Sequence, residues 1–227
     1  MLYLGDITFL LLIPALILAF YAHAKVQGNY ARYAKVRGLV GMTGAEVARI
    51  ILDRNGLQDV KIVPIEGKLT DNYDPRSREL HLSKEVYAGN SVSAMSIAAH
   101  ECGHAIQHAL GYKPIVLRAR ILPLANLGCN LAFPLFIAGL IFSLKGLMDI
   151  GILLFLAALL FQMVTLPVEY NASQRALEQL SDRIIIADEE MMGAKKVLNA
   201  AALTYVAATL MALLNLLRLL LLRNARN

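Results

Sequence analysis

Long apolar stretches divide the chain into membrane-like and polar parts. Residues 2–22 contain one charged side chain, Asp6, and two further apolar stretches, 122–144 and 150–168, flank a short polar connection at 145–149. At about 1.5 Å per residue, each stretch is long enough to cross the hydrocarbon core of a bilayer as a helix. The pattern therefore predicts an N-terminal transmembrane helix and, later in the chain, a transmembrane hairpin.

A fourth apolar stretch, 197–222, has the length of a span but is interrupted by Thr204, Tyr205, Asn215 and Arg218. Polar and ionisable groups are costly inside a bilayer. This stretch therefore either crosses the membrane or packs along the other helices and lies partly in the interface. The pattern leaves both arrangements open.

Basic residues beside the apolar stretches predict the orientation. They follow the first stretch and precede the second: Lys25, Arg32, Lys35, Arg37, Lys113, Arg118 and Arg120. Because cytoplasmic loops are enriched in Lys and Arg, we expect residues 24–120 and 169–196 in the cytoplasm and the N-terminus outside. A fourth crossing would place Arg223 and Arg226 outside, against this rule.

A cleaved signal peptide is the alternative for the first stretch, because Ala22-His23-Ala24 imitates a cleavage site. However, no Lys or Arg precedes the apolar run, as the n-region of a signal peptide requires. We therefore expect this helix to stay in the protein.

The polar region begins with a helix and a small sheet. Thr43 followed by Glu46 is a capping-box signature, and apolar residues recur behind it at helical spacing as far as 57. Alternating apolar and polar positions predict strands at 60–65 and 79–83, separated by a turn-rich segment at 70–76. We expect the strand at 79–83 to be an exposed edge that holds an extended peptide by main-chain hydrogen bonds.

A longer helix follows this sheet. Ser91 and Ser93 are both suitable N-caps, and Gly111 is a natural stop, which predicts a helix over about 91–110.

Composition supports this division and limits the function classes. Of the 227 residues, 57% are apolar and 17% are charged, with a net charge of +5. These values exclude a disordered chain and predict a lipid bilayer, and no nucleic acid, as a partner. The two cysteines, Cys102 and Cys129, cannot form a disulfide framework.

The sequence His100-Glu101-Cys102-Gly103-His104 on this predicted helix has the pattern of a metal site. Two histidines four residues apart project from one helix face toward a single ion, with the glutamate beside them as a general base. Zinc suits such a site because it accepts two imidazoles and a carboxylate and keeps a position open for water. We expect one Zn²⁺ per chain.

A catalytic zinc needs a third protein ligand, for which two residues compete. His108 lies on the same unbroken helix only eight residues after His100, whereas the metzincin pattern places its third histidine ten residues on, past a helix-breaking glycine. Glu169 directly follows the third apolar stretch, where a carboxylate is costly unless it is solvated or bound. We therefore predict Glu169 as the ligand and His108 as an outer or purely structural residue, with an interfacial carboxylate as the alternative for Glu169.

Four blocks of the sequence resemble a known family, and the likeness covers nearly the whole chain. The blocks 70–76, 80–83, 98–108 and 166–173 look like the YugP-like membrane-bound neutral zinc metallopeptidases, which are similar to gluzincins of the HtpX and CAAX-protease kind. The resemblance implies His100, His104 and Glu169 as zinc ligands and Glu101 as the catalytic carboxylate.

The chain departs from the HtpX-like pattern at one position. That pattern has an Asp four residues after the ligand Glu, where it steadies a ligand histidine, and this chain has Ser173. We expect Asn171 or Ser173 to hold a ligand histidine instead.

The resemblance implies a membrane-bound zinc endopeptidase that acts on a peptide or protein substrate. The basic residues beside the spans predict that the zinc lies at the cytoplasmic membrane surface. We expect misfolded membrane proteins or short peptides as substrates there, with a role in membrane protein quality control. Glu101 would take a proton from the attacking water and pass it to the leaving amine. Arg175 and Tyr170 are candidates for stabilising the oxyanion. The alternative is a catalytically inactive zinc-binding membrane scaffold, and the oligomeric state stays open.

The expected fold is a mostly α integral membrane protein with a zincin-like domain of one small sheet and an active-site helix, on three to four transmembrane helices. The expected parts are an N-terminal helix, a cytoplasmic zincin-like region, a hairpin, a helix with the third ligand and a C-terminal apolar helix: 1–23, 24–120, 121–168, 169–196 and 197–227.

Overall fold

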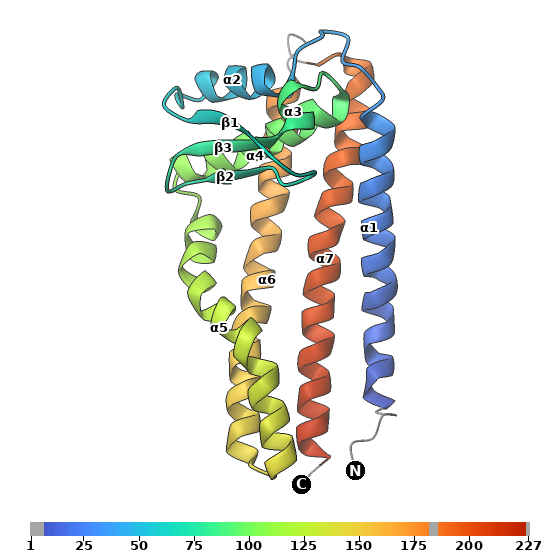
Figure 1. Ribbon diagram of the computed structural model, residues 1–227, viewed down its shortest axis with the longest axis vertical. Helices are drawn as coiled ribbons and strands as arrows, with labels where there is room; N and C mark the ends of the chain where they lie inside the picture. The colour runs from blue at the N-terminus through green and yellow to red at the C-terminus, as the bar shows by residue number, and fades with distance from the viewer. Residues whose placement is uncertain (1–6, 182–185, 226–227) are drawn as a thin grey trace. The chain divides into compact units, whose positions relative to one another are not determined.

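The described part of the chain is mostly helical, with one small sheet and four helices of membrane-spanning length (Figure 1). This computed structural model describes residues 7–181 and 186–225. The expected positions 2–6 of the first span, and Arg226, lie outside the described residues. The fold class predicted from the sequence is confirmed.

Contacts divide the chain into two units. The apolar unit comprises Met1–Ala22, Pro114–Pro167 and Thr204–Asn227, and the polar unit comprises His23–Lys113 and Val168–Leu203. Within residues 7–181 and 186–225, four long segments are apolar enough to cross a membrane: Ile7–Tyr33 (η1, Ile7–Leu12, and α1, Ile13–Tyr33), α5 (Lys113–Phe142), α6 (Lys145–Leu180) and α7 (Asp188–Asn224).

The connection within the transmembrane hairpin differs from the expected one. The expected connection at 145–149 is wrong, because α6 already begins at Lys145 and the helices are joined by Ser143 and Leu144. Ser143 adopts a φ of 57°, and the Leu144 N–H donates to the carbonyl of Gly139, which reverses the chain within these two residues.

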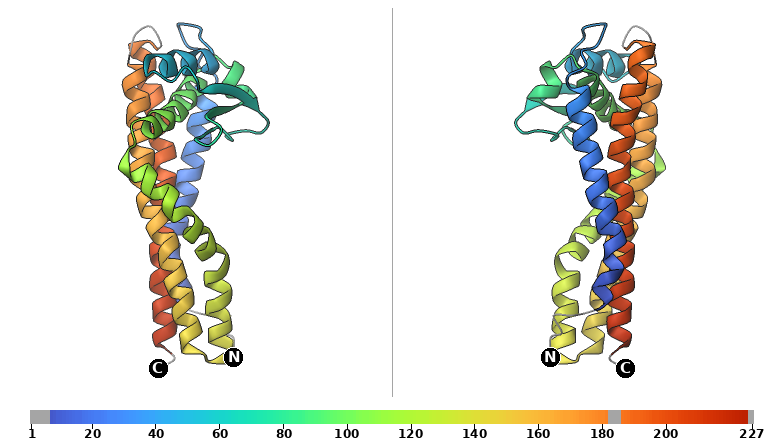
Figure 2. Two further views of the ribbon diagram at one scale, coloured as in Figure 1. Left: turned by 90° about the vertical axis from the view of Figure 1, so that its left-hand side faces the viewer. Right: turned by 90° about the vertical axis from the view of Figure 1, so that its right-hand side faces the viewer.

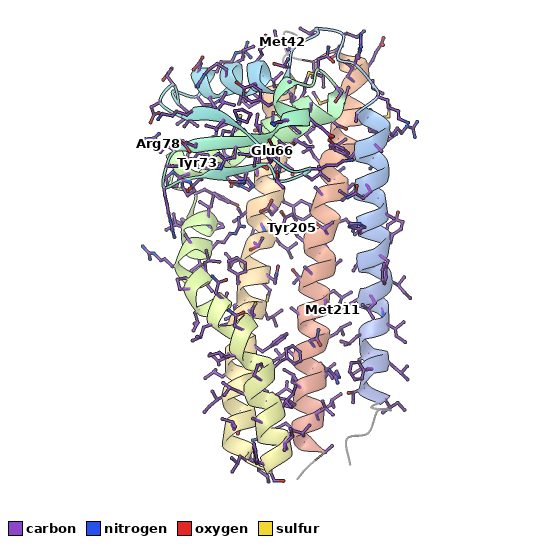
Figure 3. The ribbon with its side chains drawn as sticks, in the orientation of Figure 1. Met42, Glu66, Tyr73, Arg78, Tyr205 and Met211 are labelled. Carbon is purple, nitrogen blue, oxygen red and sulfur yellow. The ribbon has the colours of Figure 1, made fainter. Side chains whose placement is uncertain are left out.

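The last apolar stretch is part of one unbroken helix, α7, despite its polar residues. Asn215 donates its amide to the carbonyl of Met211, and Thr209 donates its hydroxyl to the carbonyl of Tyr205 (both acceptor residues are labelled in Figure 3). Bonds of this kind satisfy polar side chains inside an apolar helix without breaking it.

Close helix packing holds the apolar unit together. A Cβ on Gly128 of α5 would lie 2.3 Å from the carbonyl oxygen of Leu154 on α6, so only glycine allows this approach. The helix α5 also contains Pro123 and Pro134 and is visibly bent (Figure 2).

The end of α7 meets the start of the first helix and of α6. Arg223 binds Asp149 through two N–H···O bonds of 2.9 and 3.1 Å, and the Arg218 guanidinium lies 3.6 Å from the centre of the Phe9 ring. Within the apolar unit, these contacts place the end of α7 beside the start of α6 and of the first helix.

The polar unit contains a three-stranded mixed sheet with the order β1-β3-β2. In this sheet β1 (Lys61–Ile65) pairs in parallel with β3 (Glu79–Ser83), and β2 (Asn72–Asp74) pairs antiparallel with β3. Two sequence expectations are therefore wrong. The predicted turn at 70–76 contains a strand, and β3 is the central strand rather than an exposed edge.

The helices α2 (Gly44–Arg54), α3 (Lys84–Ala88) and α4 (Val92–Ala109) pack with this sheet around one core (Figure 1). Fully buried side chains from α2, β3 and α4 meet there: Ile51, Leu52, Leu80, Leu82, Met95 and Ala99. The expected capping box is present, since Thr43 Oγ1 accepts from the Glu46 N–H and the Glu46 carboxylate accepts from the Thr43 N–H. Ser91 is the N-cap of α4.

Candidate metal centre

The two histidines of the motif lie one turn apart on α4, with ring centres separated by 4.8 Å. Their helix approaches α6 closely at Gly103, which lies between them in the sequence. A Cβ on Gly103 would lie 2.5 Å from the carbonyl oxygen of Ala172, so glycine is required at this crossing. The approach brings the α6 side chains at 169 and 173 beside the histidines.

The structure groups the donor atoms of His100, His104 and Glu169 within 4.8 Å of one another. The Nε2 atoms of His100 and His104 lie 3.2 and 3.4 Å from Glu169 Oε2. Ligands about 2.0–2.1 Å from a tetrahedral zinc are separated by about 3.3 Å. The two imidazoles and the carboxylate therefore fit a zinc ion in both chemistry and spacing.

Both histidines are held from behind through Nδ1. Ser173 Oγ lies 3.2 Å from Nδ1 of His100, and Gln107 Oε1 lies 3.1 Å from Nδ1 of His104. Partners of this kind orient metal-binding imidazoles.

The Gln107 amide continues this network to α6. Its Nε2 donates to the carbonyl of Val168 at 2.7 Å and to Asn171 Oδ1 at 3.0 Å. Gln107 was not predicted as a site residue from the sequence. The available signal was a glutamine three residues after a candidate ligand histidine, on the same helix face.

Glu101 is buried, with 8% of its surface exposed, and lies directly after His100 and three residues before His104 in the sequence. Burial raises the pKa of its carboxyl above the ordinary value, while the charges of His100 and His104 act in the opposite direction. A buried carboxylate beside a metal site is suited to accept a proton.

The other expected site residues lie around this group. Asn171 Oδ1 also accepts from Nε of Arg175 at 2.8 Å. Tyr170 is half exposed. His108 lies one turn beyond His104, with its ring 6.0 Å from that of Tyr73, which Figure 3 labels near Arg78 on the β2–β3 hairpin. His108 is not among the three residues whose donor atoms are grouped.

Comparison with known proteins places these features in a family. The family model described as "Putative neutral zinc metallopeptidase" matches residues 8–224. The chain is 50% identical over 208 residues to the "Putative membrane protease YugP" of Bacillus subtilis (strain 168), covering 92% of each chain. No solved structure matches the chain.

Proposed function

Since the chain belongs to this family of neutral zinc metallopeptidases, we propose that it is a gluzincin-type endopeptidase with one zinc per chain, bound by His100, His104 and Glu169. The observation that carries the proposal is that one ligand atom from each of these three residues lies within 4.8 Å of the others, with the buried carboxylate of Glu101 adjacent in sequence to His100.

Zinc bound by these residues would act as a Lewis acid and lower the pKa of a coordinated water. In the proposed reaction Glu101 takes a proton from the attacking water and gives it to the nitrogen of the leaving amine. Its raised pKa suits both steps, because the carboxyl can hold the proton between them. His100 and His104 serve as neutral ligands.

The substrate would lie extended along β2. This strand forms one edge of the described sheet and packs against α4, where Tyr73 contacts the ring of His108. Main-chain hydrogen bonds to an edge strand bind a peptide by its backbone and leave side-chain specificity broad. We therefore propose segments of misfolded membrane proteins as substrates.

We propose that the site faces the cytoplasm. The basic residues around the polar unit support this orientation. The ion pair of Arg223 with Asp149 puts the end of α7 beside the start of α6, at the expected outer end of the hairpin, and so supports a fourth crossing, although Arg223 then lies outside, against the rule.

Zinc content and peptide cleavage of detergent-purified variants test the function. Glu101→Gln should lower cleavage by a factor of about 10²–10⁴ and keep the zinc, whereas Glu169→Ala should lose the zinc. The control Glu178→Gln changes an exposed carboxylate on α6 and should affect neither. Absence of zinc from chelator-free parent protein, or undiminished cleavage by Glu101→Gln, would contradict the proposal.

Thiol labelling tests the orientation. In a Cys129→Ser background, Ser77→Cys on the β2–β3 hairpin should react only with membrane-permeant reagents, and Gly146→Cys at the start of α6 should also react with impermeant ones. The reverse pattern would place the site outside.

A further inference from the structure

The hydrogen bonds behind His104 determine which of its nitrogens carries a proton. The backbone carbonyl of Val168 can only accept, so the group of Gln107 that faces it at 2.7 Å must be the NH₂. The oxygen of the Gln107 amide then faces His104 Nδ1 at 3.1 Å. Because this oxygen can only accept, Nδ1 carries the hydrogen.

The orientation of the Asn171 amide, at the other end of the network, is determined independently of Val168. A guanidinium can only donate, so the Asn171 atom 2.8 Å from Arg175 Nε must be the oxygen. The same oxygen accepts from Gln107 Nε2 at 3.0 Å. The Val168 carbonyl, which can only accept, and the Arg175 guanidinium, which can only donate, thus require the same orientation of the Gln107 amide.

His100 has no such constraint from its own partner. The hydroxyl of Ser173, 3.2 Å from His100 Nδ1, can donate or accept. The two histidines of the motif are therefore supported in different ways, one by an amide of determined orientation and one by a hydroxyl that adapts.

We infer that Gln107 is a positioning residue that holds His104 in its Nδ1–H tautomer, with Nε2 directed to the metal, and that Arg175 acts through Asn171 and Gln107. Gln107 is fully buried and bridges α4 to α6, so it also fixes the distance between His104 and the helix that carries Glu169. This inference rests on the proposed zinc site, and it gives Arg175 a positioning role instead of contact with the oxyanion.

Zinc affinity, measured by competition with a chromophoric chelator, tests the inference without reference to cleavage. Gln107→Met, which keeps the side-chain length, should weaken zinc binding by about 10–100-fold. It should also change the absorption spectrum of the Co²⁺-loaded protein. The matched control Gln174→Met alters an exposed glutamine of α6 that donates to Glu178 and should change neither.

A double-mutant cycle tests the role of Arg175. Arg175→Met should weaken zinc binding less than Gln107→Met does, and should add nothing in the Gln107→Met background, because both act through one network. This variant also keeps the test decisive if Gln107→Met fails to fold. Parent-like zinc affinity in Gln107→Met, or an Arg175→Met that lowers kcat in both backgrounds and leaves zinc affinity unchanged, would overturn the inference.

These outcomes differ from failure of the proposed function. If the parent binds zinc but no peptide is cleaved, the endopeptidase proposal fails while the effects on zinc affinity remain. If the parent binds no zinc, both fail together.

Discussion

The polar and apolar units bury their side chains by different rules. The polar unit encloses an apolar core in which Ile51, Leu80 and Met95 are fully buried. In the apolar unit many large side chains face outward, with Phe20 74% and Leu153 67% exposed. Water drives the first arrangement, whereas a bilayer solvates the second and leaves helix packing to small residues.

All three residues of the candidate metal site belong to the polar unit. A metal site needs ligands held by packed neighbours and by partners behind them. The polar unit supplies both, through its core and through Ser173 and Gln107.

Deletion of a buried side chain should have the largest effect. Leu80→Ala removes a fully buried side chain from β3 and should lower the free energy of unfolding by about 2–5 kcal/mol. Leu153→Ala, on an exposed position of α6, should cost far less. Thermal unfolding in detergent checks this contrast, and equal losses would show that the two units do not differ as described.

Introduction of a charge should have the opposite effect, with the larger cost in the apolar unit and the smaller cost in the polar unit. Leu153 and Leu110 are 67% and 66% exposed, but Leu153 lies in a predicted span and Leu110 caps α4 in the polar unit. Leu153→Lys should cost up to about 2.5–3.5 kcal/mol of membrane insertion, and Leu110→Lys should cost almost nothing. The fraction of chains recovered in membranes measures this difference. Similar recovery of both variants would argue that α6 does not cross the bilayer at Leu153.

A methyl group at either of the two close crossings with α6, at Gly103 or at Gly128, should lower stability, but at only one of them should it weaken zinc binding. Gly103→Ala and Gly128→Ala both place a Cβ within 2.5 Å of a backbone carbonyl and should each cost about 1–3 kcal/mol. We expect only Gly103→Ala to weaken zinc binding, because it pushes α4 away from the helix of Glu169.

Gly28→Ala serves as the control for both, because nothing lies within 4 Å of the added methyl group. It should be neutral or slightly stabilising, since alanine has the higher helix propensity. Weaker zinc binding in Gly128→Ala would contradict the separation of the two units.

The smallest expected effect is on the pH profile. Glu101 must be ionised to accept a proton, and burial raises its pKa. Cleavage should therefore fall on the acid side at a higher pH than an ordinary carboxyl, with a pKa of about 4.3, would produce. Zinc content measured at each pH shows whether the fall in cleavage comes from protonation of Glu101 or from loss of the metal. A fall centred at the ordinary carboxyl pKa would contradict the effect of burial on Glu101.

Local signals in the sequence were sufficient for many elements. The capping box at Thr43, the strands at 60–65 and 79–83 and the helix over 91–110 are present in the structure with nearly the predicted bounds. Each depends on residues close in sequence, so periodicity and caps are informative.

The strand β2 was missed for a physical reason. Asn72 and Asp74 are typical turn residues, and the strand is only three residues long. Its conformation is stabilised by pairing with β3, through Asn72 with His81 and Tyr73 with Leu80. The same pairing makes β3 central, which its own alternation could not reveal.

The sequence by itself determined the membrane-like composition, the helix with its HExxH motif and the candidate status of Glu169, because these follow from hydropathy and from spacing within one helix. Only the tertiary structure decided which groups of α6 stand behind the histidines. Ser173 reaches His100, and Val168 and Asn171 reach Gln107, because Gly103 lets α4 approach α6, and sequence distance alone does not encode a contact between residues more than sixty positions apart.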